Sequence, residues 1–279
     1  MAKGYNNPNY VKIKEMLAEN ELSFFEKKRY REYLDTMATF PTYSVNNQML
    51  IRLQDPQATM VCGYNEWQEK HGRYVPKGTK CHIFIFAPCK RKREVKKKDV
   101  NGNYILDANG DPVTEIKEWI DFKSTPVYDV SQTVGDPISS ISSLFSGRID
   151  GYPEVIRIVS EASPSIVRFS DAGTGYDEAD DCINIGSSLS QRDTLQALLP
   201  SIAAATMYKQ SGELYDYGSL EAESAAYVVA SHFGVSADYD FDYIADWASG
   251  NDIVEMKKMM DVIRKASGQM IKDIERCRA

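Results

Sequence analysis

The sequence predicts an α+β protein in which a small mixed domain precedes a mostly helical one. Apolar residues recur at helical spacing up to about residue 54, and short β-rich stretches with turn dipeptides follow as far as about residue 130. Helical spacing returns after about residue 190. With 279 residues, 43% of them hydrophobic and 26% charged, the chain can bury one large core or two medium ones.

The N-terminal part is expected to contain three helices and a charged β-ribbon. Helical spacing covers three segments up to Gln54, and β-rich stretches lie at 59–62 and 82–87 with a helical turn at 65–71 between them. A basic run at 90–98, two Asn-Gly turn dipeptides and a return through 122–130 are typical of a two-stranded ribbon.

A break in this pattern separates two predicted domains. The glycine, proline and serine residues at 135–143 are typical of a linker. We therefore assign residues 1–135 to an N-terminal domain, 136–150 to a linker and 151–279 to a C-terminal domain. The C-terminal domain is expected to hold a helix at 154–162, strands at 166–169 and 182–185, and helices at 192–210, 220–233, 241–247 and 252–276.

The two parts differ in charge. Residues 1–130 carry 21 Lys and Arg against 17 Asp and Glu, a net charge of about +4, whereas the rest carries 12 against 23, about −11. A basic part suits a polyanion such as a nucleic acid, and an acidic part suits basic protein surfaces.

Composition also limits the compartment and the class of site. No segment has the roughly 20 apolar residues that a membrane span needs, and the N-terminus does not resemble a secretory signal. We expect a cytoplasmic location and no membrane partner. The cysteines form no CxxC pair, so they indicate neither a disulfide framework nor a zinc ribbon, and we expect reduced thiols. They are Cys62, Cys81, Cys89, Cys182 and Cys277.

The most distinctive run, from Tyr43 to Pro88, mixes aromatic, amide and cationic side chains. Rings stack on unpaired bases, cations follow phosphates and amides bond to base edges, which is the chemistry of single-strand binding. The same residues also suit structural roles, with Tyr43, Trp67 and Tyr74 in a core and the amides at 46–48 supporting a helix. Composition alone favours the structural interpretation.

The order of these residues carries a family resemblance. The run includes Tyr43-Ser44-Val45-Asn46-Asn47-Gln48-Met49-Leu50-Ile51, then Gly63-Tyr64, Trp67, Gly72-Arg73 and Lys77-Gly78; a later passage reads Val127-Tyr128-Asp129-Val130-Ser131-Gln132-Thr133. Both passages resemble the amino-terminal domain of ArdC-type antirestriction proteins, including the LtrC-like members found on conjugative elements. The resemblance implies that the partner is single-stranded DNA and that the function is protection of incoming DNA from restriction.

We expect the DNA contacts to come from this run and from the basic segment after it. The segment from Lys90 to Lys98 holds seven cations in nine residues, which suits a solvated edge strand but also a ribbon that follows a DNA backbone. We favour the second interpretation. The candidate DNA-binding residues are Tyr43, Asn46, Asn47, Gln48, Arg52, Trp67, Arg73, Lys77, Lys80, Lys90, Arg91 and Arg93.

The C-terminal part resembles a zincin-like metallopeptidase that lacks its metal site. Such domains carry His-Glu-x-x-His on one helix and a carboxylate on the next. Glu221 stands at the third-ligand position, but Ala197 and Ser201 replace the two imidazoles and Leu198 replaces the general base. The resemblance therefore implies a degenerate domain with no metal, no cofactor and no peptidase activity.

The sequence also allows a calcium loop, a divergent hydrolase and an acidic interaction module. The spacing from Asp107 to Glu118 matches a calcium loop, but Pro112 stands where the turn glycine is needed and tight turns explain the same residues. A divergent hydrolase that uses unrecognised residues stays open. So does an acidic interaction module, or DNA mimic, that binds a host or element-encoded protein.

Overall fold

The N-terminal half begins with three helices, as the sequence predicts. The computed structural model describes residues 7–138, 152–171, 173–235 and 237–278. Helix α1 spans Pro8–Asn20, the 3-10 turn η1 spans Glu21–Phe25, α2 spans Lys27–Thr39 and α3 spans Val45–Gln54. The side chain of Asn7 caps α1 by accepting a hydrogen bond from the backbone of Asn9, and a proline occupies the first helical turn.

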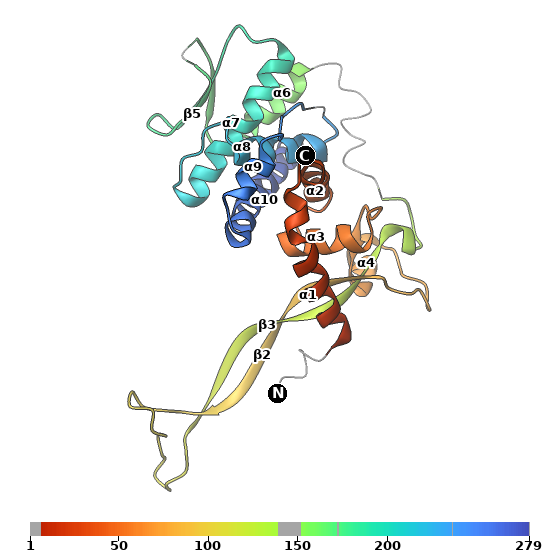
Figure 1. Cartoon of the computed structure of the whole chain (residues 1–279), viewed down its shortest axis with the longest axis vertical. Helices are drawn as coiled ribbons and strands as arrows, with labels where there is room; N and C mark the ends of the chain where they lie inside the picture. The colour runs from red at the N-terminus through yellow and green to blue at the C-terminus, as the bar shows by residue number, and fades with distance from the viewer. Residues whose placement is uncertain (1–6, 139–151, 172, 236, 279) are drawn as a thin grey trace.

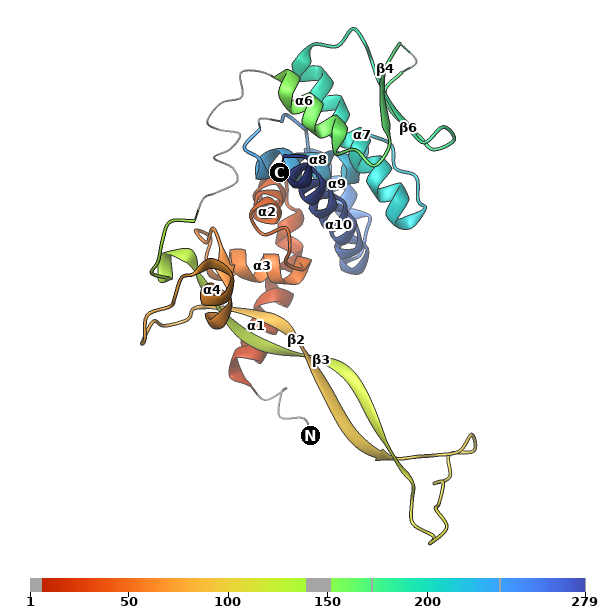
Figure 2. The same ribbon diagram turned by 180° about the vertical axis from the view of Figure 1, so that it is seen from behind.

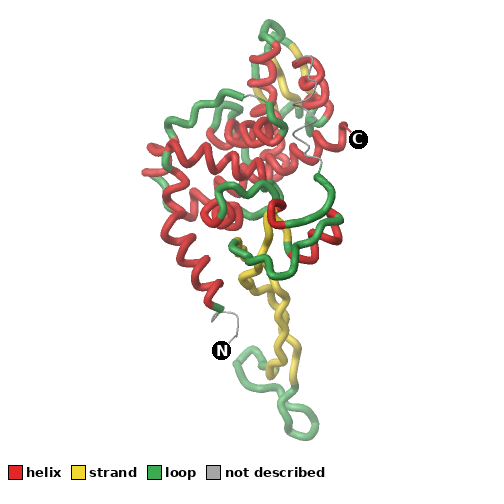
Figure 3. Tube along the Cα trace, turned by 90° about the vertical axis from the view of Figure 1, so that its right-hand side faces the viewer, coloured by secondary structure: helices red, strands yellow, loops and turns green. Residues whose placement is uncertain are grey.

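A three-stranded sheet follows, and two of its strands extend into the predicted ribbon. The elements are β1 (Val61–Cys62), α4 (Tyr64–His71), β2 (Ile83–Lys96), β3 (Thr114–Asp129) and η2 (Val130–Gln132), and the strand order is β1-β3-β2. Antiparallel pairing of β2 and β3 runs from Ile83 opposite Val127 to Lys96 opposite Thr114. The ribbon projects away from the helices in all three views (Figure 1, Figure 2 and Figure 3).

One detail differs from the prediction, because the stretches 82–87 and 90–98 form a single strand that contains Pro88. The backbone groups of Phe84 and Phe86 face away from β3, since the side chains of Gln54 and Asn47 bond to them. Pro88 has the same parity, so its nitrogen also points away from β3. Its missing donor therefore removes no ladder hydrogen bond, as is usual for proline on an edge strand.

The C-terminal half is mostly helical and has a small sheet on one side. Its elements are α6 (Tyr152–Glu161), β4 (Ile166–Phe169), β5 (Gly175–Asp177), β6 (Cys182–Ile185), α7 (Gln191–Ser211), α8 (Leu220–His232), α9 (Ile244–Ser249) and α10 (Ile253–Arg278). The short strand β5 was not predicted, and the helix expected at 241–247 begins three residues later. The predicted α+β class is confirmed. Within the described ranges, no helix is both long and apolar enough to cross a bilayer.

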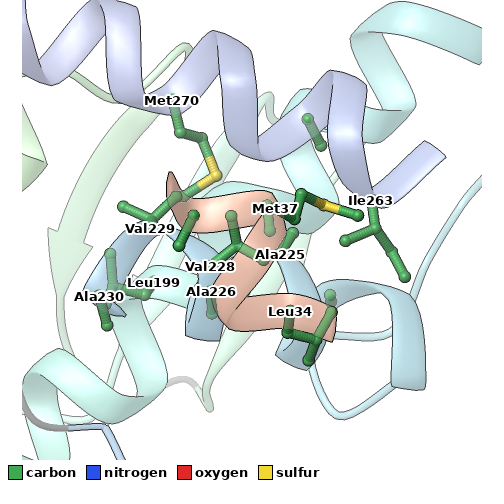
Figure 4. Packing of buried hydrophobic residues seen from close by; sticks show 14 of the residues in the cluster. Leu34, Met37, Leu199, Ala225, Ala226, Val228, Val229, Ala230, Ile263 and Met270 are labelled. Atoms are coloured by element: carbon green, nitrogen blue, oxygen red, sulfur yellow. The ribbon is translucent and has the colours of Figure 1, made fainter. Parts of the chain in front are cut away.

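Helices from both halves share one hydrophobic core. Leu34 and Met37 of α2 pack among Ala225 and Val229 of α8 and Met270 of α10 (Figure 4). The alanines of α8 allow α2 to approach closely, and buried apolar area of this kind is the main stabilising contribution to a fold. A second, smaller core lies under the sheet and contains Phe40, Ile51, Val61, Ile83, Ile85 and Val127.

Polar contacts also join the two halves. The hydroxyl of Tyr30 lies 2.8 Å from that of Ser224 in a buried contact, and Tyr227 donates to the carboxylate of Asp35. The predicted linker at 136–150 lies mostly outside the described residues, so the boundary stays a prediction. Because α2 packs against α8 and α3 against α10, experiments on this protein are best made on the full chain.

Helix α7 contains a proline whose effect on hydrogen bonding is compensated. Pro200 cannot donate to the carbonyl of Gln196, four residues earlier. That carbonyl instead accepts a hydrogen bond of 3.1 Å from the hydroxyl of Tyr239, which is buried. The helix therefore continues through all 21 residues from Gln191 to Ser211.

Candidate nucleic-acid interface

The ribbon has two faces of different composition. Side chains directly opposite each other in an antiparallel pair share a face, and the face alternates along each strand. Arg91 pairs with Trp119 and Arg93 with Lys117, so these four side chains lie on one face, to which Lys123 also belongs. We call this surface the tryptophan face.

The tryptophan face is exposed and carries excess positive charge. Trp119 is 43% exposed, and the four cations of this face are opposed by two carboxylates, Asp121 and Glu115. The Nε atom of Arg91 lies 3.6 Å from Oδ2 of Asp121, so one cation is partly neutralised. An exposed indole among cations can stack on an unpaired base while the cations contact phosphates.

The opposite face of the ribbon is more apolar and less charged. Lys90 lies opposite Ile120, and Ile116 and Phe122 lie on the same face. Ile116 and Ile120 are each 66% exposed, and Phe122 is 50% exposed. Three lysines are opposed by two glutamates here, a net charge of about +1 against about +2 on the tryptophan face.

The ribbon tip is built from tight turns. Oδ1 of Asp99 accepts hydrogen bonds from the backbones of Asn101 and Asn103, and Asp107 does the same at the next turn. Glu118 lies in β3 opposite Lys92 and thus away from the turn at Asp107. These contacts support the turn interpretation of the acidic spacing over the calcium interpretation.

The amides predicted to contact bases instead support the fold. Asn47 makes two hydrogen bonds of 2.9 Å with the backbone of Phe86 and so completes the open edge of β2. Gln48 is fully buried, donates to the carbonyl of Phe40 and accepts from the hydroxyl of Tyr33. Satisfied buried amides of this kind are structural, so neither side chain can reach a ligand in this conformation.

Trp67 and Arg73, also predicted to contact DNA, are buried as well. Trp67 has no exposed surface and donates from Nε1 to the carbonyl of Tyr128 at 2.9 Å. Arg73 is 9% exposed and bonds to Thr133 and to the carbonyl of Gly135. The expectation that Trp67 is a stacking platform therefore needs correction, because its ring packs in the protein interior.

The other candidates are at least partly accessible. We call the protein outside the projecting ribbon the body. There, Arg52 donates to the carbonyl of Pro56 and Tyr43 donates to the carbonyl of Val61. Asn46 is half-buried on α3, whereas Lys77 and Lys80 are exposed on the loop before β2; Lys90, Arg91 and Arg93 lie along the ribbon. Three of the twelve candidates thus lie along the ribbon, with Arg91 and Arg93 on the tryptophan face and Lys90 on the opposite face.

The passage from Tyr128 to Thr133 closes the sheet onto α4. The carboxylate of Asp129 accepts hydrogen bonds from the backbones of Thr59, Met60 and Ser131. Burial acts to raise the pKa of Asp129, but these hydrogen bonds outweigh it and hold the pKa below its ordinary value. The two passages that carry the family resemblance are therefore in direct contact, through Asp129 and Arg73.

The degenerate metal site offers no set of ligands. Leu198 and Ser201 of α7 are fully buried, and the hydroxyl of Ser201 donates to the carbonyl of Ala197. Glu221 lines a cleft of about 650 Å³ beside Trp247. Of these four positions only Glu221 has a side chain suited to zinc, so the residues present do not fit a zincin metal centre.

Among the described residues, the potential metal ligands Asp177, Asp180 and Cys182 form one close group. Their ligand atoms lie within 4.8 Å of one another, in the small sheet. The group does not include Glu221. Nothing else in the structure points to a ligand there.

Comparison with known proteins identifies the N-terminal segment. Residues 12–118 match the family model of the N-terminal domain of anti-restriction factor ArdC. The chain carries an ArdC-type domain. The resemblance predicted from the sequence is confirmed. The matched segment runs from α1 through the basic segment 90–98 and the ribbon tip to Glu118, one residue before Trp119.

Two crystal structures of the antirestriction protein ArdC from plasmid R388 are similar to the chain. The metal-free structure shares 17% identity, with a TM-score of 0.47, and the match covers 84% of this chain and 86% of that one. The Mn(II)-bound structure shares 15% identity, with a TM-score of 0.46, and the match covers 85% of each chain. No curated protein matches the chain.

Trp119 was not among the candidate residues, because little in its sequence context indicates a binding role. It lies in an acidic stretch, and its exposure depends on the pairing of β3 with β2. The pairing register could have identified Trp119. The two Asn-Gly turns lie between the strands, so a ribbon that reverses there pairs segment 115–121 with the basic run.

Proposed function

We propose that this ArdC-like chain binds single-stranded DNA through the tryptophan face of its ribbon. The observation that carries the proposal is the exposed Trp119 directly opposite Arg91, with Arg93, Lys117 and Lys123 on the same face. Stacking on an indole requires an unpaired base, and the surrounding cations can neutralise phosphates. The matching domain belongs to an anti-restriction factor, which is consistent with a DNA partner.

The proposal is tested by titrating the full chain with a labelled single-stranded oligonucleotide and with the matching duplex over a series of salt concentrations. Single strands should bind more tightly, and the affinity should fall as salt rises because counterions are released from the phosphates. Trp119→Ala should weaken single-strand binding by about 1–3 kcal/mol. No single-strand binding at about 50 mM salt would overturn the proposal.

In the cell, this binding would serve antirestriction, that is, protection of entering DNA from host restriction. Support comes from the matched domain family and from the basic N-terminal half. The test compares the transfer of unmodified plasmid DNA into restricting and non-restricting recipients, with and without the protein. Protection confined to restricting recipients is expected, and equal transfer with and without the protein would contradict it.

We further propose that the C-terminal half is a scaffold without metallopeptidase activity. Ala197, Leu198 and Ser201 cannot ligate zinc or activate water, and Leu198 and Ser201 are buried in the shared core. The purified chain should contain no stoichiometric zinc by elemental analysis. About one zinc per chain, lost on Glu221→Gln, would show that a metal site exists.

The acidic charge of this half favours a protein partner with a basic surface, either host-encoded or element-encoded. Its net charge of about −11 repels DNA and attracts cationic surfaces. Reversing exposed charges there, for example Glu178→Lys and Asp246→Lys, should reduce protection in the transfer assay and leave single-strand binding intact. Unchanged protection would argue against such a partner.

A further inference from the structure

A cavity of about 510 Å³ opens at the base of the ribbon. Its walls come from the turn between α2 and α3, from β1, from α4 and from the body-proximal ends of β2 and β3. These segments lie far apart in the sequence, so the fold alone assembles the cavity. Its volume is within the range of ordinary ligand sites.

The cavity combines an apolar interior with polar groups. Phe40, Tyr43 and Ile85 line it, and the hydroxyl of Tyr43 is occupied by the carbonyl of Val61. Polar lining is supplied by Thr39, Thr42, Thr125, Lys70, His71 and Glu66, and Nζ of Lys70 lies 2.6 Å from Oε1 of Glu66. Flat apolar walls with hydroxyl and cationic groups match a nucleobase, which has apolar faces, a polar edge and an attached phosphate.

One wall group has incomplete hydrogen bonding. Oγ1 of Thr125 is buried and has no hydrogen-bond partner in the described structure. Because Oγ1 is closed off from solvent, a ligand in the cavity does not reach it in this conformation, and the unpaired hydroxyl does not count toward ligand binding.

The cavity also lies on the same face of the ladder as Trp119. Ile85 and Ala87 line it from β2, and Thr125 lines it from β3. Residues of the same parity further along the strands are Arg91 and Trp119. The tryptophan face therefore continues into the cavity, with Lys123, opposite Ala87, at the junction.

The separation suits a short stretch of strand. Six residues of β3 separate Trp119 from Thr125, which is about 20 Å of extended chain. That length corresponds to about six nucleotides at the stacked spacing of ~3.4 Å, and to fewer in an extended strand.

We infer that the cavity receives one unstacked base of a single strand whose backbone runs along the tryptophan face from Trp119 through Lys123. The inference rests on the proposed function and deepens it, because it gives the strand a fixed end point on the body. Lys70 lines the cavity in an ion pair with Glu66, so its contact with the phosphate of the captured nucleotide would replace that ion pair.

The native cysteines allow a direct footprint. Cys62 lines the cavity, with Sγ 3.7 Å from Nε2 of His71; Cys89 lies on the tryptophan face, and Cys277 is exposed at the C-terminus. Burial, and then the charge of Glu66, raise the pKa of the Cys62 thiol, so alkylation by iodoacetamide is followed at about pH 9. The rate at each cysteine is read by mass spectrometry of the full chain after digestion.

With a thymidine 12-mer at about ten times its dissociation constant, alkylation of Cys62 and Cys89 should slow about tenfold, while Cys277 is unaffected. Protection of Cys89 alone would overturn the inference and leave the proposed function intact. Absence of oligonucleotide binding would remove both. Protection of Cys62 by thymidine monophosphate but not by the 12-mer would make the cavity a small-molecule site and also overturn the inference.

A cavity-filling variant gives a second readout. Ala87→Phe places a ring into the cavity from a half-buried strand position and should weaken binding of the 12-mer about tenfold. The matched control is Leu214→Phe, at an exposed position on the body. Unchanged affinity in a folded Ala87→Phe variant, with an unfolding transition like the wild type, would contradict the inference.

Discussion

Strands β2 and β3 are packed against the body at one end and project into solvent at the other. The packed end stabilises the fold, and the projecting end is the proposed DNA-binding surface. Near the body, the edge of β2 is completed by the amides of Asn47 and Gln54, and Ile83 and Val127 are buried. Along the ribbon, side chains on both faces meet solvent, and cations replace the apolar residues. The packed part thus fixes the pairing register of the two strands. In the projecting part, that register determines which side chains share an exposed face.

The two tryptophans test this contrast most strongly. Trp67→Ala should cost about 3–5 kcal/mol of unfolding free energy, because it removes a fully buried ring, and should weaken DNA binding only through unfolding. Trp119→Ala should leave the unfolding free energy within about 0.5 kcal/mol of wild type and weaken single-strand binding.

Urea denaturation and fluorescence anisotropy of each variant make the comparison. The milder Trp67→Phe keeps a ring in the core and serves where Trp67→Ala does not fold. A folded Trp67→Phe that loses binding while Trp119→Ala keeps it would reverse the assignment of the two regions.

Neutralising the ribbon should have the next largest effect. The variant Arg91→Gln, Arg93→Gln and Lys117→Gln, all on the tryptophan face, should weaken single-strand binding about 10- to 100-fold and reduce the slope of log affinity against log salt by about 2, given three lost phosphate contacts. A body variant that removes the same number of charges, Lys28→Gln, Lys258→Gln and Lys272→Gln at exposed positions, should change neither quantity. Equal losses in both variants would mean that net charge, and not the ribbon, drives binding.

Acid titration sharpens the role of the passage around Asp129. Its pKa is lowered in the folded state, so its contribution to stability is present above the unfolded value of about 3.9 and is lost as the pH falls through the lower folded value. Asp129→Asn should therefore cost about 1–3 kcal/mol at pH 7 and less near pH 3. Urea midpoints of both proteins across this range measure the difference, and a difference that does not change with pH would contradict it.

The smallest predicted effect concerns α7, outside the proposed DNA-binding region. Tyr239→Phe should cost about 1 kcal/mol because it leaves the carbonyl of Gln196 unpaired. In a Pro200→Ala background the restored backbone donor can satisfy that carbonyl, so the cost of Tyr239→Phe should shrink. A double-mutant cycle by denaturation measures this coupling, and strictly additive costs would show that the two groups are independent.

Periodicity and turn residues were enough to predict most of the fold. The helices α2, α7, α8 and α10 follow apolar spacing, and the ribbon follows from its basic run and Asn-Gly turns. The burial of Asn47 and Trp67 could not be predicted, because each depends on a partner from a distant segment, Phe86 and Tyr128 respectively.

The candidate site was predictable only where it is local in sequence. Arg91 and Arg93 belong to one basic run and were identified, whereas Trp119 joins them only through cross-strand register. The cavity was missed for the same reason, since Thr39, Cys62 and Thr125 meet only in the folded chain. From the sequence alone, amide and aromatic side chains that bind a ligand cannot be distinguished from those that stabilise the sheet.

Removing the ribbon while keeping the body tests the central claim most directly. Cys89 and Asp121 are partners in the ladder, so replacing residues 90–120 with an Asn-Gly turn should close a short hairpin at this pair. We expect the shortened chain to unfold at the same urea midpoint as the wild type. We also expect it to bind a single-stranded oligonucleotide at least about 100-fold more weakly at low salt. Wild-type affinity in the shortened chain would contradict the claim that the ribbon is the DNA-binding element.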